Sequence, residues 1–384
     1  MNCILLLLLI IIFTFQDMKL NKNEKLSVEM RDKRSIYLKM PYKWEFPIKY
    51  SVKRPIRNKV VDKGIKFIEK QTCVRFKKVS NLKTAGLIFT KGDSCSSVVG
   101  KKSKIEPQQI TITEECEIPG VIEHETAHAL GLLHEHTRND RDNYVKIYKK
   151  NIFKEYILDF HKFNNSLSKS FNISYDLGSV MQYQKNAGSK NEKSSVEPNN
   201  ILYSKTMGQR TELSFNDIKL INYYYCGDIC KNSILKCLYN GYPDPNNCNV
   251  CKCPRIYSGN SCQDIEKSDP SCKEKLLKAE IFTKHLNIFG KKSCYHKIYS
   301  DENYKVILMI KFASFRSNEI CQPNYGLEVK FLTDKSISGV MFCGISKNIE
   351  IESEDNEIVL HYKGIRNFDY VKIKYKQILK KDNL

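Results

Sequence analysis

The stretch that decides the fold is residues 124–134, which read His-Glu-Thr-Ala-His-Ala-Leu-Gly-Leu-Leu-His. On a helix, residues four apart share one face, so His124 and His128 can direct two imidazoles at one ion. Glu125 lies one position further round, within reach of a water molecule on that ion. His134 would supply a third nitrogen. Three protein ligands leave one coordination position open, which is typical of a catalytic zinc site.

Gly131 explains how the third histidine returns to the site. Glycine tolerates a positive φ, which ends the helix and turns the chain back. Zinc lowers the pKa of a bound water to about 7, and Glu125 can take its proton. The alternative is an ordinary helix with solvated histidines. The glycine and the third histidine at fixed offsets argue against it, since three of the eight histidines fall in this stretch.

A second motif lies 45 residues after the third histidine and reads Ser179-Val180-Met181-Gln182-Tyr183. In metzincin peptidases a tight turn that carries a methionine forms an apolar floor beneath the three histidines. A methionine alone more often belongs to an ordinary core. Its meaning here comes from the histidines upstream, which is why we interpret this segment as a Met-turn.

These motifs resemble those of the astacin zinc metallopeptidases. The segment 124–145 (HETAHALGLLHEHTRNDRDNYV) is close to the family signature, as are 175–181 (YDLGSVM) and 207–210 (MGQR). The resemblance covers residues 35–226 and implies an α+β catalytic domain that holds one Zn²⁺. Its cleft is expected between an amino-terminal sheet subdomain, ending near Gly131, and a less regular second half.

The resemblance also implies roles for single residues. Tyr183 would be an extra zinc ligand that leaves the metal when substrate binds and then stabilises the oxyanion. Met181 would form the floor of the site, and Glu135 would meet the mature amino terminus in a buried contact. Two disulfides are implied in this domain: Cys73–Cys226 and Cys95–Cys116.

Four positions depart from the family pattern. Glu123 replaces an apolar residue and Thr126 a leucine, while Gln182 and Gln184 replace a histidine and a glycine. None of these changes removes a metal ligand or Glu125, but they affect groups that orient the ligands. The alternative function is therefore a catalytically weak or inactive secreted protein that binds or adheres through its accessory modules.

The amino terminus indicates the compartment. Residues 4–15 are apolar apart from one threonine, a length that suits a signal peptide better than a membrane span. We expect a signal peptide at 1–18, with a signal anchor as the alternative, and no membrane span elsewhere. Fifteen cysteines favour an oxidising compartment, and fourteen remain once Cys3 leaves with the signal peptide. The protein is therefore expected to be secreted.

Residues 19–34 form a short segment that ends in the basic run Arg-Asp-Lys-Arg. The run resembles a site for a furin-type processing protease, and an ordinary charge run is the alternative. In the astacin family the mature chain starts a fixed short distance before a tryptophan, which matches the spacing between Ser35 and Trp44. We expect a propeptide at 19–34, cleaved after Arg34, without the F-x-G-D stretch of the usual family propeptide.

At roughly 100–200 residues per domain, a chain of 384 residues predicts two or three domains. Residues 227–264 contain six cysteines, which cannot surround a large core, so disulfides must hold this unit together. The unit resembles an EGF-like module, and a zinc knuckle is the alternative. The resemblance implies three disulfides: Cys230–Cys248, Cys237–Cys251 and Cys253–Cys262.

From Cys272 onward the sequence changes to runs of alternating or β-branched residues, which predict an all-β sandwich in a domain at 265–376. Its cysteines and the stretch 324–329 resemble a CUB domain that lacks the acidic residue expected for calcium. The resemblance implies two disulfides: Cys272–Cys294 and Cys321–Cys343. Residues 377–384 are expected to form a frayed tail. The order of the three units resembles nematode members of the astacin family.

Together these observations predict a secreted zinc endopeptidase that cleaves extracellular proteins, matrix proteins among them, after activation by a processing protease. Basic side chains follow the Met-turn at Lys185, Lys190 and Lys193. They suggest a preference for an acidic residue just after the scissile bond.

The net charge of +20 permits polyanion binding but does not identify it. Lysine and asparagine run through every region and no nucleic-acid-binding signature occurs, so a solvated basic surface is favoured over a nucleic-acid site. Two N-glycosylation sequons begin at Asn164 and Asn172, before the Met-turn.

Overall fold

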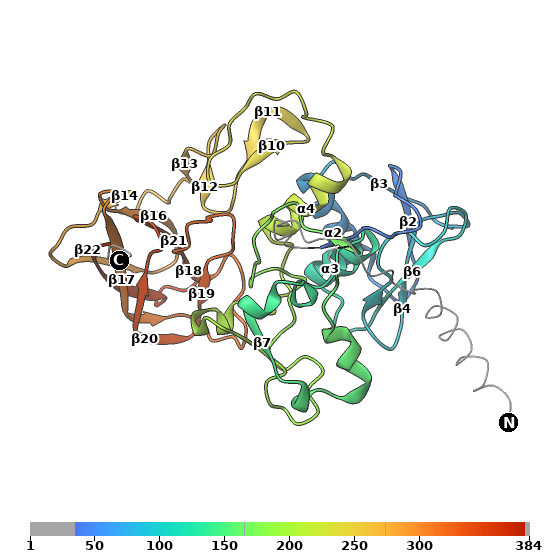
Figure 1. Cartoon of the computed structure of the whole chain (residues 1–384), viewed down its shortest axis with the longest axis horizontal. Coiled ribbons are helices and arrows are strands. Elements are labelled where there is room, and N and C mark those ends of the chain that lie inside the picture. Colours follow the sequence, from blue (N-terminus) through green and yellow to red (C-terminus); the bar gives the residue numbers. More distant parts are fainter. Residues whose placement is uncertain (1–34, 165, 273, 381–384) are drawn as a thin grey trace, which may run out of the picture. The chain divides into compact units, whose positions relative to one another are not determined.

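The structure is a computed structural model that describes residues 35–164, 166–272 and 274–380 (Figure 1). The predicted signal peptide, the predicted propeptide and residues 381–384 lie outside the described residues. Among the helices that are described, none combines the length and the apolar character that a crossing of the bilayer requires.

A five-stranded sheet organises the first half of the amino-terminal domain. Its strand order is β3-β2-β4-β6-β5, with the first four strands parallel and β5 antiparallel to β6. The elements of this half are β1 (Ile36–Tyr37), β2 (Ile48–Val52), α2 (Asn58–Gln71), β3 (Phe76–Lys78), β4 (Leu87–Lys91), β5 (Ser96–Ser97), β6 (Gln108–Ile112) and α3 (Pro119–Ala129).

Helices α2 and α3 pack closely because each offers an apolar surface to the other. Helix α2 buries Val61, Gly64, Ile65 and Ile68, at the spacing of one helical face. Gly64 allows the close approach, since a Cβ there would lie 2.9 Å from Cβ of Ile122 on α3. Helix α3 is buried on nearly all sides, which fixes the residues that it carries.

After Gly131 the chain is less regular, as predicted. Short 3-10 turns and two- or three-residue strands replace long elements until the last helix. The elements are η1 (Glu135–Thr137), η2 (Arg141–Asn143), β7 (Val145–Ile147), η3 (Lys149–Asn151), η4 (Lys154–Phe160), β8 (Ser168–Lys169), β9 (Val196–Pro198), η5 (Ile201–Lys205) and α4 (Phe215–Tyr225). A capping box starts α4, in which Ser214 and Asp217 bond to each other's backbone N–H.

The next unit is small and rich in disulfides. It contains two hairpins, β10–β11 and β12–β13, with bounds Tyr242–Asp244, Asn247–Lys252, Tyr257–Ser258 and Asp264–Ile265. All six of its cysteines are in disulfides, so the zinc-knuckle alternative is wrong. The described residues contain seven disulfides, which are the pairs named above: Cys73–Cys226, Cys95–Cys116, Cys230–Cys248, Cys237–Cys251, Cys253–Cys262, Cys272–Cys294 and Cys321–Cys343.

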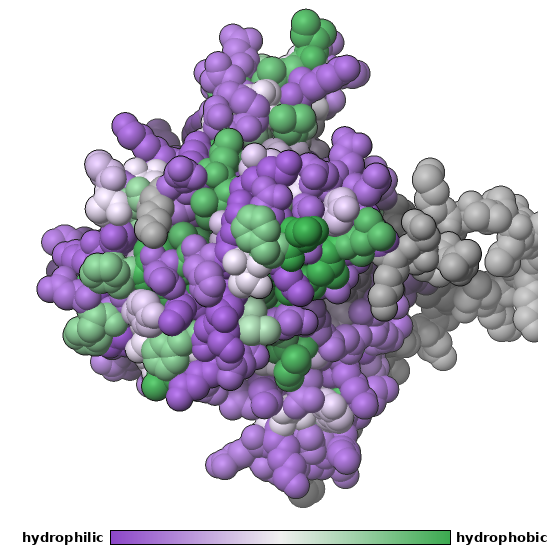
Figure 2. All heavy atoms as spheres, turned by 90° about the vertical axis from the view of Figure 1, so that its left-hand side faces the viewer, coloured by the Kyte–Doolittle hydropathy of each residue, from purple (hydrophilic) through white to green (hydrophobic). Residues whose placement is uncertain are grey.

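The carboxy-terminal domain is all-β and has two sheets, of order β14-β16-β21-β18-β19 and β15-β22-β17-β20. The strands are β14 (Leu276–Lys278), β15 (Lys284–Phe289), β16 (Ser293–Tyr299), β17 (Tyr304–Ser314), β18 (Gly326–Lys330), β19 (Val340–Phe342), β20 (Ile345–Glu352), β21 (Glu357–Lys363) and β22 (Tyr370–Leu379). The predicted boundary at 376 is too early, because β22 keeps pairing with β17 as far as Leu379. Hydrophilic side chains dominate the outer face of this domain (Figure 2).

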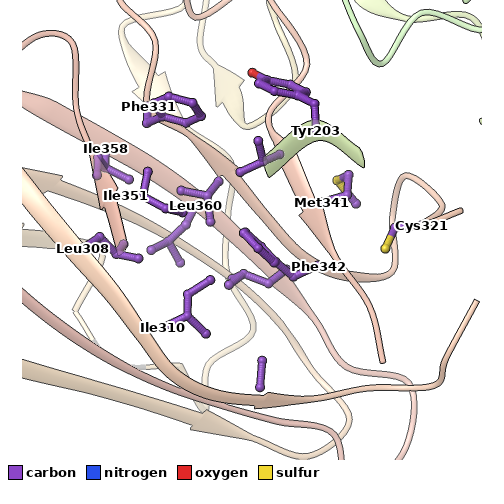
Figure 3. Close-up of a cluster of buried hydrophobic side chains, with 14 of the residues drawn as sticks. Tyr203, Leu308, Ile310, Cys321, Phe331, Met341, Phe342, Ile351, Ile358 and Leu360 are labelled. Atoms are coloured by element: carbon purple, nitrogen blue, oxygen red, sulfur yellow. The ribbon is translucent and has the colours of Figure 1, made fainter. Parts of the chain in front are cut away.

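Contacts join this domain to the amino-terminal one. Tyr203 of η5 lies in the same hydrophobic cluster as Phe331, Met341 and Phe342 (Figure 3). Met341 N donates to the Thr206 hydroxyl at 2.8 Å. The described parts of the two domains therefore share one apolar cluster.

An ion network links all three units. The Arg255 guanidinium, from the disulfide-rich unit, pairs with Glu212 at 2.9 Å and with Glu328 of β18 at 3.1 Å. Burial alone would raise the pKa of Glu328, but the nearby Arg255 and Lys330 cations outweigh it and hold that pKa at about 2. Since the ordinary pKa is higher, ionised Glu328 stabilises the fold above about pH 4.5, and this contribution disappears as pH falls toward about 2.

We therefore expect Glu328→Gln to lower the free energy of unfolding at pH 7 by on the order of 3 kcal/mol. Urea denaturation at pH 7 and at pH 3 should show a smaller difference from wild type at the lower pH. Glu350→Gln, at an exposed position of β20, is the control and should change little. An equal loss for Glu328→Gln at both pH values would contradict the assignment.

Candidate active site

Helix α3 carries the first two candidate zinc ligands. The four-residue spacing places His124 and His128 on one face, with ring centroids 4.7 Å apart. Nδ1 of His124 donates to the Val180 carbonyl at 2.9 Å, and Nδ1 of His128 donates to the Leu132 carbonyl at 2.7 Å. These bonds leave both Nε2 atoms for a metal.

Gly131 turns the chain so that the third histidine joins them, as predicted. Its φ is +104°, and a Cβ there would lie 2.6 Å from Sδ of Met40. Nε2 of His134 lies 3.1 Å from Nε2 of His128. Ligand atoms of His124, His128 and His134 all lie within 4.8 Å of one another. The three imidazoles are positioned to bind one zinc ion.

The protonation of the three histidines suits that role. Burial lowers the pKa of His128 to about 4 and lowers the pKa values of His124 and His134 well below the usual value. All three rings are therefore neutral near pH 7, with a lone pair available for a metal.

The three histidines line a cavity with a volume of about 350 Å³, and Glu125 lines it as well. The residue is 4% exposed, and its Oε2 has no hydrogen-bond partner among the described residues. Burial raises the pKa of this carboxyl to about 8, against the opposing effect of Arg210. An unpartnered buried carboxylate oxygen beside three imidazoles fits a site built for a metal and a water.

The Met-turn is held from below by the start of α4. Oδ1 of Asp217 accepts a hydrogen bond from the Ser179 hydroxyl at 2.6 Å, and its Oδ2 accepts one from Val180 N at 3.2 Å. The Met181 side chain is buried, and its carbonyl accepts from Glu135 N at 2.9 Å. The same turn thus orients His124 and anchors the segment that follows His134.

Tyr183 lines the cavity next to the third histidine. Its ring centroid lies 4.4 Å from that of His134 and 3.9 Å from that of His136, on which it stacks. Burial raises the pKa of the Tyr183 phenol, so it stays protonated and can donate a hydrogen bond. His136 was not predicted. Its Nε2 bonds to the Asp159 carbonyl at 3.0 Å and thereby fixes the platform under Tyr183.

Arg210 supplies the positive charge of the site. Its guanidinium lines the histidine cavity and donates to the carbonyls of Val180 and Gln182, at 2.9 and 3.0 Å. In the sequence Arg210 ends the stretch MGQR, from which no role for it was predicted. The lysines that were expected to provide charge, at 185, 190 and 193, are not among the residues that line this cavity.

Glu135 lies directly after the third histidine and is 4% exposed. Its Oε1 accepts from Asp176 N at 2.8 Å and pairs with Arg138 at 3.3 Å. Nearby, the Ser35 carbonyl accepts from Leu133 N at 3.2 Å. Ser35, which would begin the mature chain, is buried and bonds to the chain two residues before Glu135, while Arg34 is outside the described residues.

Two of the four residues that depart from the family pattern, Glu123 and Gln182, form hydrogen bonds within the scaffold. Oε2 of Glu123 accepts from Leu213 N at 2.9 Å and so ties α3 to the loop before α4. Oε1 of Gln182 accepts from the Tyr175 hydroxyl at 2.6 Å. Asn164 and Asn172, the two sequon residues, are both exposed.

Known proteins resemble this chain in sequence. The family model for astacin, which is a peptidase family, matches residues 37–226. Zinc metalloproteinase nas-34 of Caenorhabditis elegans is 33% identical over 342 residues, which cover 88% of this chain and 56% of that protein. Zinc metalloproteinase nas-26 of the same organism is 33% identical over 316 residues, which cover 79% of this chain and 74% of that protein.

Among solved structures, high choriolytic enzyme 1, a hatching enzyme zinc-protease from Oryzias latipes, is 30% identical. The match covers 46% of this chain and 88% of that chain, with a TM-score of 0.42. The chain spans little more than half the length of nas-34 but most of nas-26. The sequence matches and the three convergent imidazoles agree: this chain belongs to the astacin family of zinc metallopeptidases.

Proposed function

We propose that the protein is a zinc-dependent endopeptidase. The observation that carries this proposal is the placement of three neutral imidazoles, an unpartnered buried carboxylate and a phenol around one cavity. A zinc ion held by His124, His128 and His134 would polarise the substrate carbonyl and acidify a water molecule.

Glu125 and Tyr183 perform the proton and charge chemistry in this proposal. The Glu125 carboxylate takes a proton from the attacking water and passes it to the leaving amine, because its buried side chain lines the same cavity as the three histidines. The Tyr183 hydroxyl donates a hydrogen bond to the oxyanion that develops on the substrate. The stacked His136 ring keeps the phenol in place.

The rival function is a secreted binding protein without turnover, suggested by Glu123, Gln182 and Gln184. The structure favours the enzyme, because the first two side chains bond within the scaffold and leave the ligand set intact. Two features support catalysis: the cavity beside the histidines, and the Glu125 oxygen for which the described part of the chain offers no hydrogen-bond partner.

Several wider assignments belong to the same proposal. We infer secretion, with a signal peptide at 1–18 and cleavage after Arg34 by a processing protease. Seven disulfides fit an oxidising compartment. The substrates would be extracellular proteins, and the EGF-like and CUB-like units would contribute binding. Exposed Asn164 and Asn172 would accept glycans.

Glu125→Gln tests the proposed base. The amide keeps the shape of the side chain but cannot take a proton, so we expect kcat/KM on casein-derived peptides to fall by about 10³-fold. Zinc content, measured by atomic absorption, should stay at the wild-type level. Cleavage at the wild-type rate by a pure preparation of this variant would exclude Glu125 as the base.

Tyr183→Phe separates oxyanion stabilisation from binding. Loss of one hydrogen-bond donor to the developing charge should lower kcat by about 10²-fold, with little change in KM. The phenyl ring can keep its stacking on His136, so zinc content and melting temperature should hold. A change confined to KM would show that Tyr183 only helps to bind substrate.

Arg210 is the residue to test for acidic specificity. Among peptides that differ only after the scissile bond, we expect aspartate to be preferred over alanine by about 10- to 100-fold, as for a charged hydrogen bond. Arg210→Met should remove this preference, whereas substitution of Lys190 and Lys193 should not. Zinc content serves as the check on folding. If the wild-type enzyme cleaved the aspartate and alanine peptides equally well, the predicted acidic preference would be wrong.

A further inference from the structure

A second cavity, larger than the one around the histidines, lies against helices α2 and α3. Its volume is about 730 Å³, and Arg210 lines both cavities. Residues from α2, the start of α3, the loop at 208–212 and two residues of the carboxy-terminal domain, Ile320 and Gln322, form its walls. We call it the lysine cavity, after the three lysines of α2 that line it: Lys63, Lys66 and Lys70.

The three lysines share one face of α2, since they stand three and four residues apart. All three side chains are exposed, and none forms an ion pair with a carboxylate among the described residues. Like charges this close repel one another, so a nearby anionic group would relieve that repulsion.

The two carboxylates of the cavity are already engaged. Glu212 pairs with Arg255 at 2.9 Å. Glu123 is 2% exposed, and its Oε2 accepts from Leu213 N. With Lys63, Lys66, Lys70 and Arg210 on the other side, the lining carries an excess of positive charge that its own acidic residues do not neutralise.

The wall between these charges is apolar. Phe67 of α2, Ile118 and Pro119 before and at the start of α3, and Ile320 all line the cavity. Ile118 is 43% exposed although its side chain is large and hydrophobic. An occupant that matches this lining has carboxylates for the lysines and one or two apolar side chains for the wall.

We propose that the lysine cavity is a second substrate-binding site, which takes an acidic and partly apolar segment of the protein substrate away from the scissile bond. The proposal rests on the proposed peptidase function. Continuity through Arg210 favours a substrate segment as the occupant, because a chain bound at the zinc site can reach the neighbouring cavity without leaving the protein surface. The site would raise affinity for substrates that carry such a segment and leave the chemical step unchanged.

The test compares two triple variants that remove the same charge. Lys63→Ala/Lys66→Ala/Lys70→Ala alters the cavity. Lys53→Ala/Lys77→Ala/Lys83→Ala is the control, since these lysines are exposed in the same subdomain but neither belong to α2 nor line the cavity. Two fluorogenic peptides share one scissile core, and one of them carries an extension of glutamates and leucines where the other has serines.

For wild type and control, we expect the acidic extension to lower KM about tenfold at low salt, with kcat unchanged, and this advantage to shrink at about 0.5 M NaCl. The cavity variant should lose the advantage and cleave the serine peptide normally. The proposal would be overturned if both triple variants lost the KM advantage of the acidic extension equally, or if neither variant lost it.

Fluorescence anisotropy with the labelled extension alone, which has no scissile core, separates this proposal from the peptidase function. Wild-type protein should bind it about tenfold more tightly than the cavity variant does. Binding with this difference but without cleavage of any peptide would support the cavity and count against the peptidase. Cleavage of the peptides, together with equal binding of the extension by wild type and cavity variant, would support the peptidase function and contradict the second binding site.

Discussion

The convergence of three imidazoles depends on where two backbone carbonyls point. Val180 and Leu132 accept the Nδ1 protons of His124 and His128, which fixes each ring and turns its Nε2 toward the cavity. A helix alone gives the spacing of the two histidines but not the rotation of their rings. The carbonyls come from the Met-turn and from the chain after Gly131, so both segments must be in place before the ligand set exists.

The second half of the amino-terminal domain has few regular elements, and hydrogen bonds from single carboxylates hold its turns in place. Asp217 caps α4 and also holds the turn at 179–181, so a single carboxylate joins a helix start to the turn whose Val180 carbonyl orients His124. Further out, Oδ1 of Asp176 accepts from Ser338 N of the carboxy-terminal domain at 3.1 Å. The Asp176 N–H bonds to Glu135 beside the third histidine. The accessory domain thus contacts the active-site segment through one intermediate residue.

Much of the site could be predicted because its information is local. Ligand spacing, the positive φ of Gly131 and the position of the Met-turn follow from short motifs. The strands of the last domain could be predicted from the alternation of residues along them. The end of the final strand could not, because pairing with β17 extends it to Leu379. The alternative interpretation of the disulfide-rich unit as a zinc knuckle is wrong, because its six cysteines pair with one another.

The missed features are those set by contacts between distant segments. Arg210 reaches the cavity only because the loop at 208–212 folds against the Met-turn. The platform of His136 depends on the carbonyl of Asp159, 23 residues away. The lysines at 185, 190 and 193 do not line the cavity of the histidines, because charge in a sequence does not reveal which side chains face a cleft.

X-ray absorption at the zinc edge tests the central claim most directly. The zinc-loaded mature protein should bind one zinc per chain and show three imidazole nitrogens at about 2.0–2.1 Å. His128→Ala should lose one nitrogen and most of its zinc. A spectrum with sulfur ligands, or one with fewer than three imidazoles in the wild-type protein, would contradict the account.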